Sequence, residues 1–170
     1  ELFQLSCTLG DSHGCDYLFA TNEGRETFTT ATQNLPLAVK YCDLGGAEAC
    51  YKAASTISNS QAETPETSKM IVKFGRLACH RGSLAGCNVM GHLARDYFQG
   101  CNSGIKVAVS CAFAGYLALE GLQLPPLAGA PVPKNPELAI TLLKRSCLAG
   151  AKVICHDLLA IESEAGEAKK

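Results

Sequence analysis

Apolar and small residues recur at helical spacing in short segments along the chain, and each segment begins or ends at a cysteine. In the clearest segment, positions i, i+3, i+4, i+7 and i+8 are occupied by Ala139, Leu142, Leu143, Ser146 and Cys147. Such a stripe is typical of an amphipathic helix with one buried face. Similar patterns flank other cysteines in LPLAVKYC, MIVKFGRLAC, CYKAAST, CNVMGHLARDYF and CAFAGYLALEG. The pattern predicts an all-α protein built from consecutive short helices.

The ten cysteines fall into five local pairs, four with seven intervening residues and one with nine. These pairs are Cys7 and Cys15, Cys42 and Cys50, Cys79 and Cys87, Cys101 and Cys111, and Cys147 and Cys155. Zinc sites usually place two ligands two to four residues apart, and no C-x2-C motif occurs. A seven-residue interior suits a disulfide across a chain reversal, where the two Cα atoms come within about 7 Å. We therefore expect five disulfides in an oxidising compartment, with metal-binding thiols as the alternative.

Glycine follows the first cysteine of every pair by three positions, at Gly10, Gly45, Gly82, Gly104 and Gly150. A left-handed residue just past a helix end stops the helix, and glycine adopts that conformation at least cost. Each pair is therefore expected to contain a helix end, a glycine stop and a new helix start. A small residue also recurs four positions after three of the second cysteines, at Ala54, Gly91 and Gly115, which indicates close helix–helix approach.

Helix starts are marked by a capping residue followed by proline and an acidic residue. Thr64-Pro65-Glu66 and Asn135-Pro136-Glu137 each have this order, and Asn34 before Pro36 is a weaker version. Proline is favoured at the first helical position, and the preceding polar side chain can accept a hydrogen bond from the first turn. Helices are expected to begin at these three places.

The spacing of the cysteine pairs predicts a single repeat domain over residues 1–170. First cysteines 35 and 37 residues apart match an antiparallel helix-pair repeat, whereas later intervals of 22 and 46 do not. The expected units are 1–44, 45–81, 82–104, 105–148 and 149–163, followed by a solvated tail at 164–170. In the abbreviated third unit, HLARDYFQGC is expected to run one helix into a short second one. An α/α solenoid explains the fixed Gly-to-Cys offset, and a disulfide-bonded helical bundle is the alternative.

The segment GAPVPKNPELAITLLKRSCLAGA resembles the Sel-one-like repeat, a relative of the tetratricopeptide repeat, and YLALEG is similar to the end of that repeat's first helix. The segments LAGCNVMGHLA and ARDYFQGCNSG resemble the middle repeats of a cysteine-rich mitochondrial branch of the family. The resemblance extends from Cys7 to about Ile161 and implies a solenoid of about four to five helix-pair repeats. It also implies a non-catalytic, protein-binding scaffold in the mitochondrial intermembrane space. The implied partners are other protein subunits of cytochrome c oxidase or a related respiratory complex, for which the chain would be an accessory subunit or assembly factor.

Charge and hydropathy narrow the classes of partner. The net charge is −1 and the pI is about 6.5, which disfavours nucleic acid or an anionic membrane as the main partner. The charge-free stretch from Val107 to Leu119 is too short to span a bilayer. The first 14 residues lack the basic start and long apolar run of a secretory signal peptide. We expect a protein partner and no direct membrane span.

Candidate chemistry is sparse. Ser103 and Lys106 match the S-x-x-K nucleophile motif of penicillin-recognising enzymes, but no S-D-N or K-T-G motif accompanies them. The histidines, possible metal or haem ligands, are His13, His80, His92 and His156. No H-E-x-x-H, C-x-x-C-H, G-x-G-x-x-G or P-loop motif occurs. The sequence predicts no catalytic residue, no cofactor and no metal site.

Two other classes of function stay open. One is a secreted or periplasmic bacterial cysteine-rich repeat protein that binds a host or cell-wall ligand, with possible penicillin-hydrolase activity. The other is a redox or metal enzyme, which would require a free thiol or a ligand cluster.

The apolar insertion LQLPPLAGAPVP is expected to lie over its own fold, with partner contact as the alternative. Each nine-residue disulfide loop contributes roughly 2–3 kcal/mol, so reduction is expected to lower the melting temperature steeply.

Overall fold

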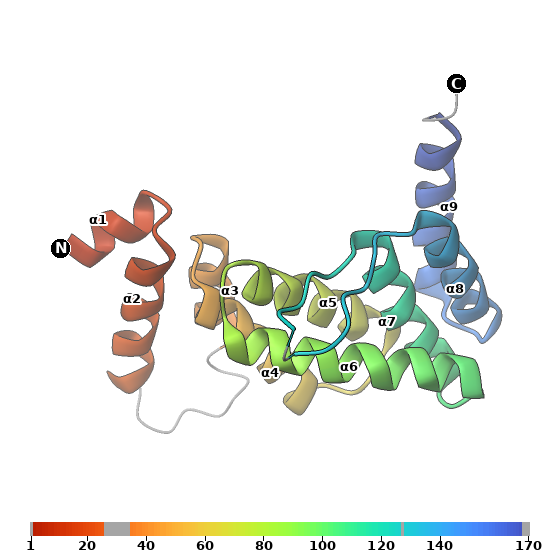
Figure 1. Ribbon diagram of the computed structural model, residues 1–170, viewed down its shortest axis with the longest axis horizontal. Helices are drawn as coiled ribbons and strands as arrows, with labels where there is room; N and C mark the ends of the chain where they lie inside the picture. The colour runs from red at the N-terminus through yellow and green to blue at the C-terminus, as the bar shows by residue number, and fades with distance from the viewer. Residues whose placement is uncertain (1, 26–34, 127, 168–170) are drawn as a thin grey trace.

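The protein is all-helical over the residues that the computed structural model describes, which are 2–25, 35–126 and 128–167 (Figure 1). The helices within these ranges are α1 (Leu2–Thr8), α2 (Ser12–Arg25), α3 (Leu35–Asp43), α4 (Ala47–Ser60), α5 (Pro65–His80), α6 (Leu84–Ser103), α7 (Val107–Glu120), α8 (Pro136–Leu148) and α9 (Lys152–Glu167). The described residues contain no strand beyond one isolated antiparallel bridge between Leu122 and Val132. The predicted all-α class is confirmed.

Packing is local along the chain. Every helix contacts the helix that follows it, and second-neighbour contacts join α2, α4 and α6 on one side and α3, α5 and α7 on the other. The result is an elongated molecule with α1 and α2 at one end and α8 and α9 at the other (Figure 1). The largest fully buried side chains belong to Phe113, Ile57, Met90, Leu117 and Leu143.

Each cysteine pair forms the predicted corner, in which one helix ends, a glycine follows and the next helix begins. The five glycines three positions after the first cysteines all have positive φ, between 80° and 115°. At the corner between α5 and α6, the Gly82 N–H donates to Cys79 O at 3.0 Å and the Ser83 N–H donates to Ala78 O at 2.9 Å. This pair of bonds is the Schellman arrangement, which satisfies the last carbonyls of a helix.

The five disulfides have the predicted local pairing. They link the cysteines at 7 and 15, 42 and 50, 79 and 87, 101 and 111, and 147 and 155. Their Cα–Cα distances lie between 4.4 and 4.9 Å, within the range of ordinary disulfides. Each disulfide joins the end of one helix to the beginning of the next. All ten cysteines are therefore used in the fold, and none is free.

Two of the three predicted helix starts are confirmed. The Thr64 hydroxyl accepts a hydrogen bond from the Thr67 N–H at 3.2 Å, and the Thr64 N–H donates to Thr67 Oγ1 at 2.9 Å. The Asn135 side chain accepts from the Leu138 N–H at 3.0 Å. The third candidate, Asn34, lies outside the described residues, and α3 begins at Leu35.

The expectation of a second, short helix inside the third unit is wrong. Residues 84–103 form one continuous helix of 20 residues, α6, which ends at Gly104 with φ +80°. At 1.5 Å per residue this helix is about 30 Å long, and it separates its two disulfide cysteines, Cys87 and Cys101, by about 21 Å. Because the chain makes one helix here instead of two, the later corners change edges. The disulfides 7–15, 42–50 and 79–87 follow one edge of the molecule, and 101–111 and 147–155 follow the opposite edge.

Contacts between neighbouring corners support this arrangement on both edges. The Arg81 guanidinium donates to Cys42 O and lies 3.2 Å from Cys50 Sγ, joining the second and third corners. On the other edge, Arg145 Nη2 donates to Cys101 O at 2.8 Å, joining the last two corners. Charge-assisted hydrogen bonds to buried carbonyls are among the stronger single contacts in a fold. Arginine therefore couples successive helix pairs at two places.

The first helix pair is coupled to the second through a cap supplied by a distant residue. The Asp16 carboxylate, on α2, accepts hydrogen bonds from the backbone N–H groups of Ala47, Glu48 and Ala49 at 3.2, 2.9 and 3.4 Å. These groups belong to the first turn of α4, whose own N-cap residue, Gly46, has no side chain to offer. Asp16 thus satisfies the N-terminus of a helix more than 30 residues further along the chain.

The insertion between α7 and α8 lies over its own fold, as expected. Leu122 and Val132 exchange backbone hydrogen bonds of 2.8 and 2.9 Å, which close the loop. A Cβ added at Gly91 on α6 would lie 1.9 Å from Ala128 O. The segment that packs against this glycine is therefore the insertion and not another helix. The prediction of close helix approach is thus wrong at Gly91. It is confirmed at Gly115, where an added Cβ would meet the Leu143 side chain of α8 at 2.7 Å.

The C-terminal segment is more ordered than the sequence indicated. Helix α9 continues through Glu167, so the predicted tail at 164–170 is helical over its first four residues, and 168–170 lie outside the described residues. Glu162 on α9 forms an ion pair with Lys144 on α8, with 2.7 Å between Nζ and Oε1. Glu162 lies two residues before the predicted tail.

Candidate functional site

An apolar groove of about 600 Å³ lies between α5, α7 and α9. It is lined by Lys69, Met70, Val72, Lys73, Arg76, Leu77, Tyr116, Leu119, Glu120, Asp157, Ala160 and Ile161. Most of the lining surface is apolar, with Met70, Leu77, Leu119 and Ile161 only partly buried. Figure 1 shows that α9 extends beyond the other helices at this end of the molecule. The groove exposes apolar side chains next to charged ones, which is the usual composition of a binding surface.

A polar cluster joins the three helices that line the groove. The Tyr116 hydroxyl on α7 donates to Asp157 Oδ2 on α9 at 2.5 Å, and Lys69 Nζ on α5 lies 2.6 Å from the same oxygen. The Lys69 ammonium is also 5.4 Å from the centre of the Tyr116 ring. One carboxylate therefore joins three helices that are far apart in sequence. The cluster fixes α9 against α5 and α7 and so maintains the width of the groove.

The protonation states of the cluster favour this clamp. Burial raises the pKa of the Tyr116 hydroxyl, and its hydrogen bond to Asp157 and the carboxylate charge raise it further, so the hydroxyl remains a donor. Burial alone would raise the pKa of Asp157, but the hydrogen bonds from Lys69 and Tyr116 outweigh it and the net pKa is lowered. Asp157 is consequently a carboxylate at neutral pH and can accept both bonds.

The rim of the groove is formed by charged side chains. Arg76 Nη1 and Glu120 Oε2 lie 2.7 Å apart, an ion pair that crosses from α5 to α7. Within the described residues, Lys73 has no carboxylate partner, and its ammonium lies 5.1 Å from the centre of the Phe74 ring. The rim on the α5 side is therefore mainly basic.

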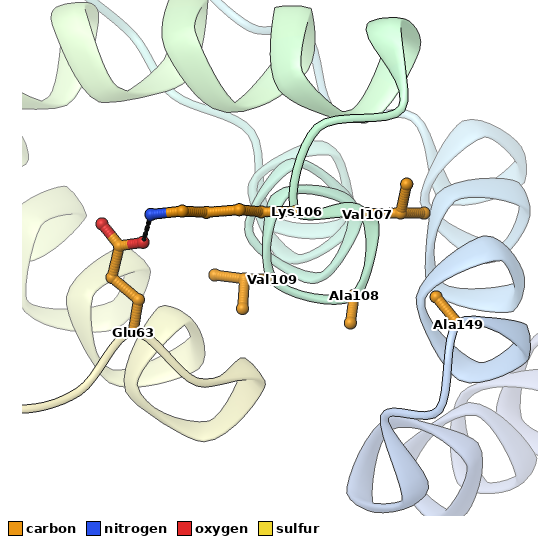
Figure 2. Close-up of a pocket in the computed structure, with 6 residues that line it drawn as sticks. All are labelled: Glu63, Lys106, Val107, Ala108, Val109 and Ala149. Carbon is orange, nitrogen blue, oxygen red and sulfur yellow. Dashed lines mark hydrogen bonds and ion pairs between the residues drawn. The ribbon is translucent and has the colours of Figure 1, made fainter.

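A second depression, of about 700 Å³, lies at the beginning of α7 (Figure 2). It is lined by Glu63, Lys106, Val107, Ala108, Val109 and Ala149. Figure 2 shows the Lys106 side chain extended toward Glu63, with which it forms an ion pair. The surface is open and its lining side chains are few, so it offers less to a partner than the apolar groove.

The S-x-x-K residues have separate partners. The Ser103 hydroxyl donates to Gln99 O of its own helix at 2.9 Å. The ammonium of Lys106 is directed to Glu63. A nucleophilic serine needs a base that accepts its proton, and here the proton of Ser103 is directed to a backbone carbonyl.

The four histidines, namely His13, His80, His92 and His156, are all exposed and are scattered over four helices. His92 Nδ1 lies 2.9 Å from Arg95 Nη2. Over the described part of the chain, no group of three or more His, Cys, Asp or Glu side chains is arranged to hold a metal ion. None of the helices in the described ranges combines the length and the apolar character needed to cross a membrane.

The sequence reasoning did not identify the groove. Its members come from three helices, and Lys69 and Asp157 are 88 residues apart. One signal was present: α5 has apolar residues on more than one face, including Met70 and Leu77 outside its fully buried positions. A surplus of apolar positions on a central helix indicates a second packed or exposed apolar face.

Comparison of the chain with protein-family models, with curated proteins and with solved structures gives no match.

Proposed function

We propose that this protein is a non-catalytic scaffold that binds another protein in the apolar groove between α5, α7 and α9. The observation that carries the proposal is the partly exposed apolar floor of the groove, between helices held in place by disulfides and by the Tyr116–Asp157–Lys69 cluster. A rigid groove of this kind loses little conformational entropy when a partner binds, which favours affinity.

The helix pairs are proposed to form an α/α solenoid of Sel-one-like repeats. Support comes from the packing of each helix on its sequence neighbours and from the recurrence of the same glycine-and-disulfide corner five times. In such arrays each unit contacts mainly the units beside it, and the stacked helices form an extended binding surface.

The proposed setting is the mitochondrial intermembrane space, where the chain would act as an accessory subunit or assembly factor of cytochrome c oxidase or a related respiratory complex. The resemblance to the cysteine-rich mitochondrial branch of the repeat family supports this setting. The five disulfides are consistent with any oxidising compartment, including the secreted alternative. Fractionation of cells that express the protein, with protease protection of intact mitochondria, separates the two settings.

Site-specific photocrosslinking tests the binding function. A photoreactive phenylalanine derivative is placed at Leu119 in the groove, and a matched derivative is placed at Leu148, which is 87% exposed and is not among the residues that line the groove. The native complex is irradiated and its adducts are identified. We expect a discrete protein adduct from position 119 and none of the same mass from position 148. The same adducts from both positions, or none from position 119, would contradict the proposal.

A further inference from the structure

Four basic side chains follow one edge of α5 at helical spacing. Lys69, Lys73, Arg76 and His80 fall at i, i+4, i+7 and i+11. The first three line the apolar groove, and the last lines a neighbouring hollow of about 130 Å³ that shares Arg76 and Glu120 with it. The two hollows therefore form one continuous surface with a basic edge about 17 Å long, at 1.5 Å per residue.

This edge is basic although the protein as a whole is slightly acidic. The net charge of the chain is −1, yet four lysine and arginine side chains line the two hollows against two carboxylates, Glu120 and Asp157. Both carboxylates are already in ion pairs with Arg76 and Lys69. Across the described ranges, Lys73 and Lys134 remain without a carboxylate partner, so the surface has an excess of positive charge.

We infer that the partner segment is an amphipathic helix with an acidic edge, an inference that rests on the proposed binding function. Its apolar side chains would contact the floor formed by Met70, Leu77, Leu119 and Ile161. Its carboxylates would face the basic edge of α5. A groove that presents apolar contacts in this way accepts anchors at i, i+3, i+4 and i+7 of a helix.

The spacing of the cations favours a helical partner over an extended one. The lysines and arginine of this edge, Lys69, Lys73 and Arg76, are three or four residues apart, which corresponds to about 4.5–6 Å along the helix. Carboxylates on one edge of a partner helix repeat at the same interval. Side chains on one face of a strand repeat at about 6.8 Å and lose register with the row within a few pairs. A helix of roughly three turns matches the length of the edge.

Synthetic peptides test the inference on the intact, oxidised 170-residue chain. The probe is a 14-residue helical peptide, capped at both ends and fluorescently labelled, with leucines at i, i+3, i+7 and i+10 and glutamates along one flank. A matched peptide has lysines in place of the glutamates. We expect the glutamate peptide to bind about tenfold more tightly by fluorescence anisotropy, since two or three partly exposed ion pairs differ between the peptides. The difference is expected to shrink with added salt.

Charge-reversal variants of the protein provide a second test of the preference for the glutamate peptide. Lys73→Glu together with Lys134→Glu is expected to remove or invert the preference, because both side chains are exposed and neither has an ionic partner to lose. Lys152→Glu, at the exposed beginning of α9 and outside both hollows, is the matched control and is expected to change nothing. Circular dichroism verifies that all variants are folded.

The outcomes separate the inference from the proposed function. Equal binding of both peptides, weakened by Leu119→Gln, would overturn the acidic preference and leave the groove as a binding site. Binding of neither peptide, or self-association of the chain that occupies the groove, would overturn the inference. Failure of the photocrosslinking experiment at position 119 would instead contradict the binding function itself.

Discussion

Replacement of Asp16 by alanine removes the cap that α2 supplies to the N-terminus of α4. Three N–H groups lose their acceptor, and Gly46 has no side chain that could replace it. Loss of an N-cap typically costs about 0.5–2 kcal/mol, and the loss of a negative charge at a helix N-terminus adds to this. In a protein of this size, 1 kcal/mol shifts the melting temperature by about 2–4 °C. We therefore expect Asp16→Ala to melt about 2–8 °C lower than the wild-type protein.

Asp43→Ala is the matched control because it removes the same charge from an exposed position in the last turn of α3. A carboxylate near a helix C-terminus is unfavourable, so this variant is expected to be neutral or slightly stabilised. Thermal unfolding of the oxidised proteins by circular dichroism measures both effects, and hydrogen exchange should be faster at Glu48 N–H in Asp16→Ala alone. If both variants melt at the wild-type temperature, the first helix pair is not coupled to the second as described.

Three further changes test other parts of the fold. Arg81→Ala removes the hydrogen bond to Cys42 O and is expected to lower the free energy of unfolding by about 1–2 kcal/mol in urea denaturation; an unchanged midpoint would count against corner coupling. Because the fold lowers the pKa of Asp157 from 3.8, its contribution to stability is complete above that value and is lost as the pH falls through the lowered pKa. As the pH falls below about 4, the free energy of unfolding should therefore decrease less for Asp157→Asn than for the wild-type protein. The same decrease with pH in both proteins would refute this. Gly91→Ala places a Cβ against Ala128 O, so we expect faster limited proteolysis within 121–135, and wild-type cleavage rates would contradict the loop placement.

The corners of the fold could be predicted because their determinants are local. Helix termination by glycine depends on the φ of one residue and on hydrogen bonds within about six residues. The glycine offset and the cysteine spacing both lie inside that window, so Gly82 together with Cys79 and Cys87 was sufficient to predict the corner between α5 and α6. The same reasoning applied at all five corners, and the pairing of the cysteines followed from it.

The length of α6 could not be predicted because it depends on packing. The break was expected from the repeat pattern, because a helix-pair unit needs two helices between successive cysteine pairs, and Gly86, Gly91 and Gly100 also lower the helix propensity of this segment. Each glycine instead lies against a neighbour: a Cβ at Gly86 would meet the Ala78 side chain at 2.7 Å, and one at Gly100 would meet Ser110 Oγ at 2.8 Å. Contacts from other segments thus keep the helix continuous, and these contacts cannot be deduced from the sequence of α6 alone.

The groove could not be predicted for a related reason. Its polar cluster depends on the crossing of α5, α7 and α9, which brings Tyr116 and Lys69 to the same oxygen of Asp157. Helix crossing depends on which side chains interdigitate, and this information is spread over many residues. The basic edge of α5 is visible in the sequence, but its meaning depends on knowing that this face of α5 lines a groove.

The account depends most on the five local disulfides, because they fix how consecutive helices meet and so fix the groove. Peptide mapping of the native protein by mass spectrometry, after alkylation without reduction, tests them directly. We expect no alkylated cysteine and only the linked pairs 7–15, 42–50, 79–87, 101–111 and 147–155. Alkylated cysteines in the native protein, or a peptide that links two different corners, would contradict the account.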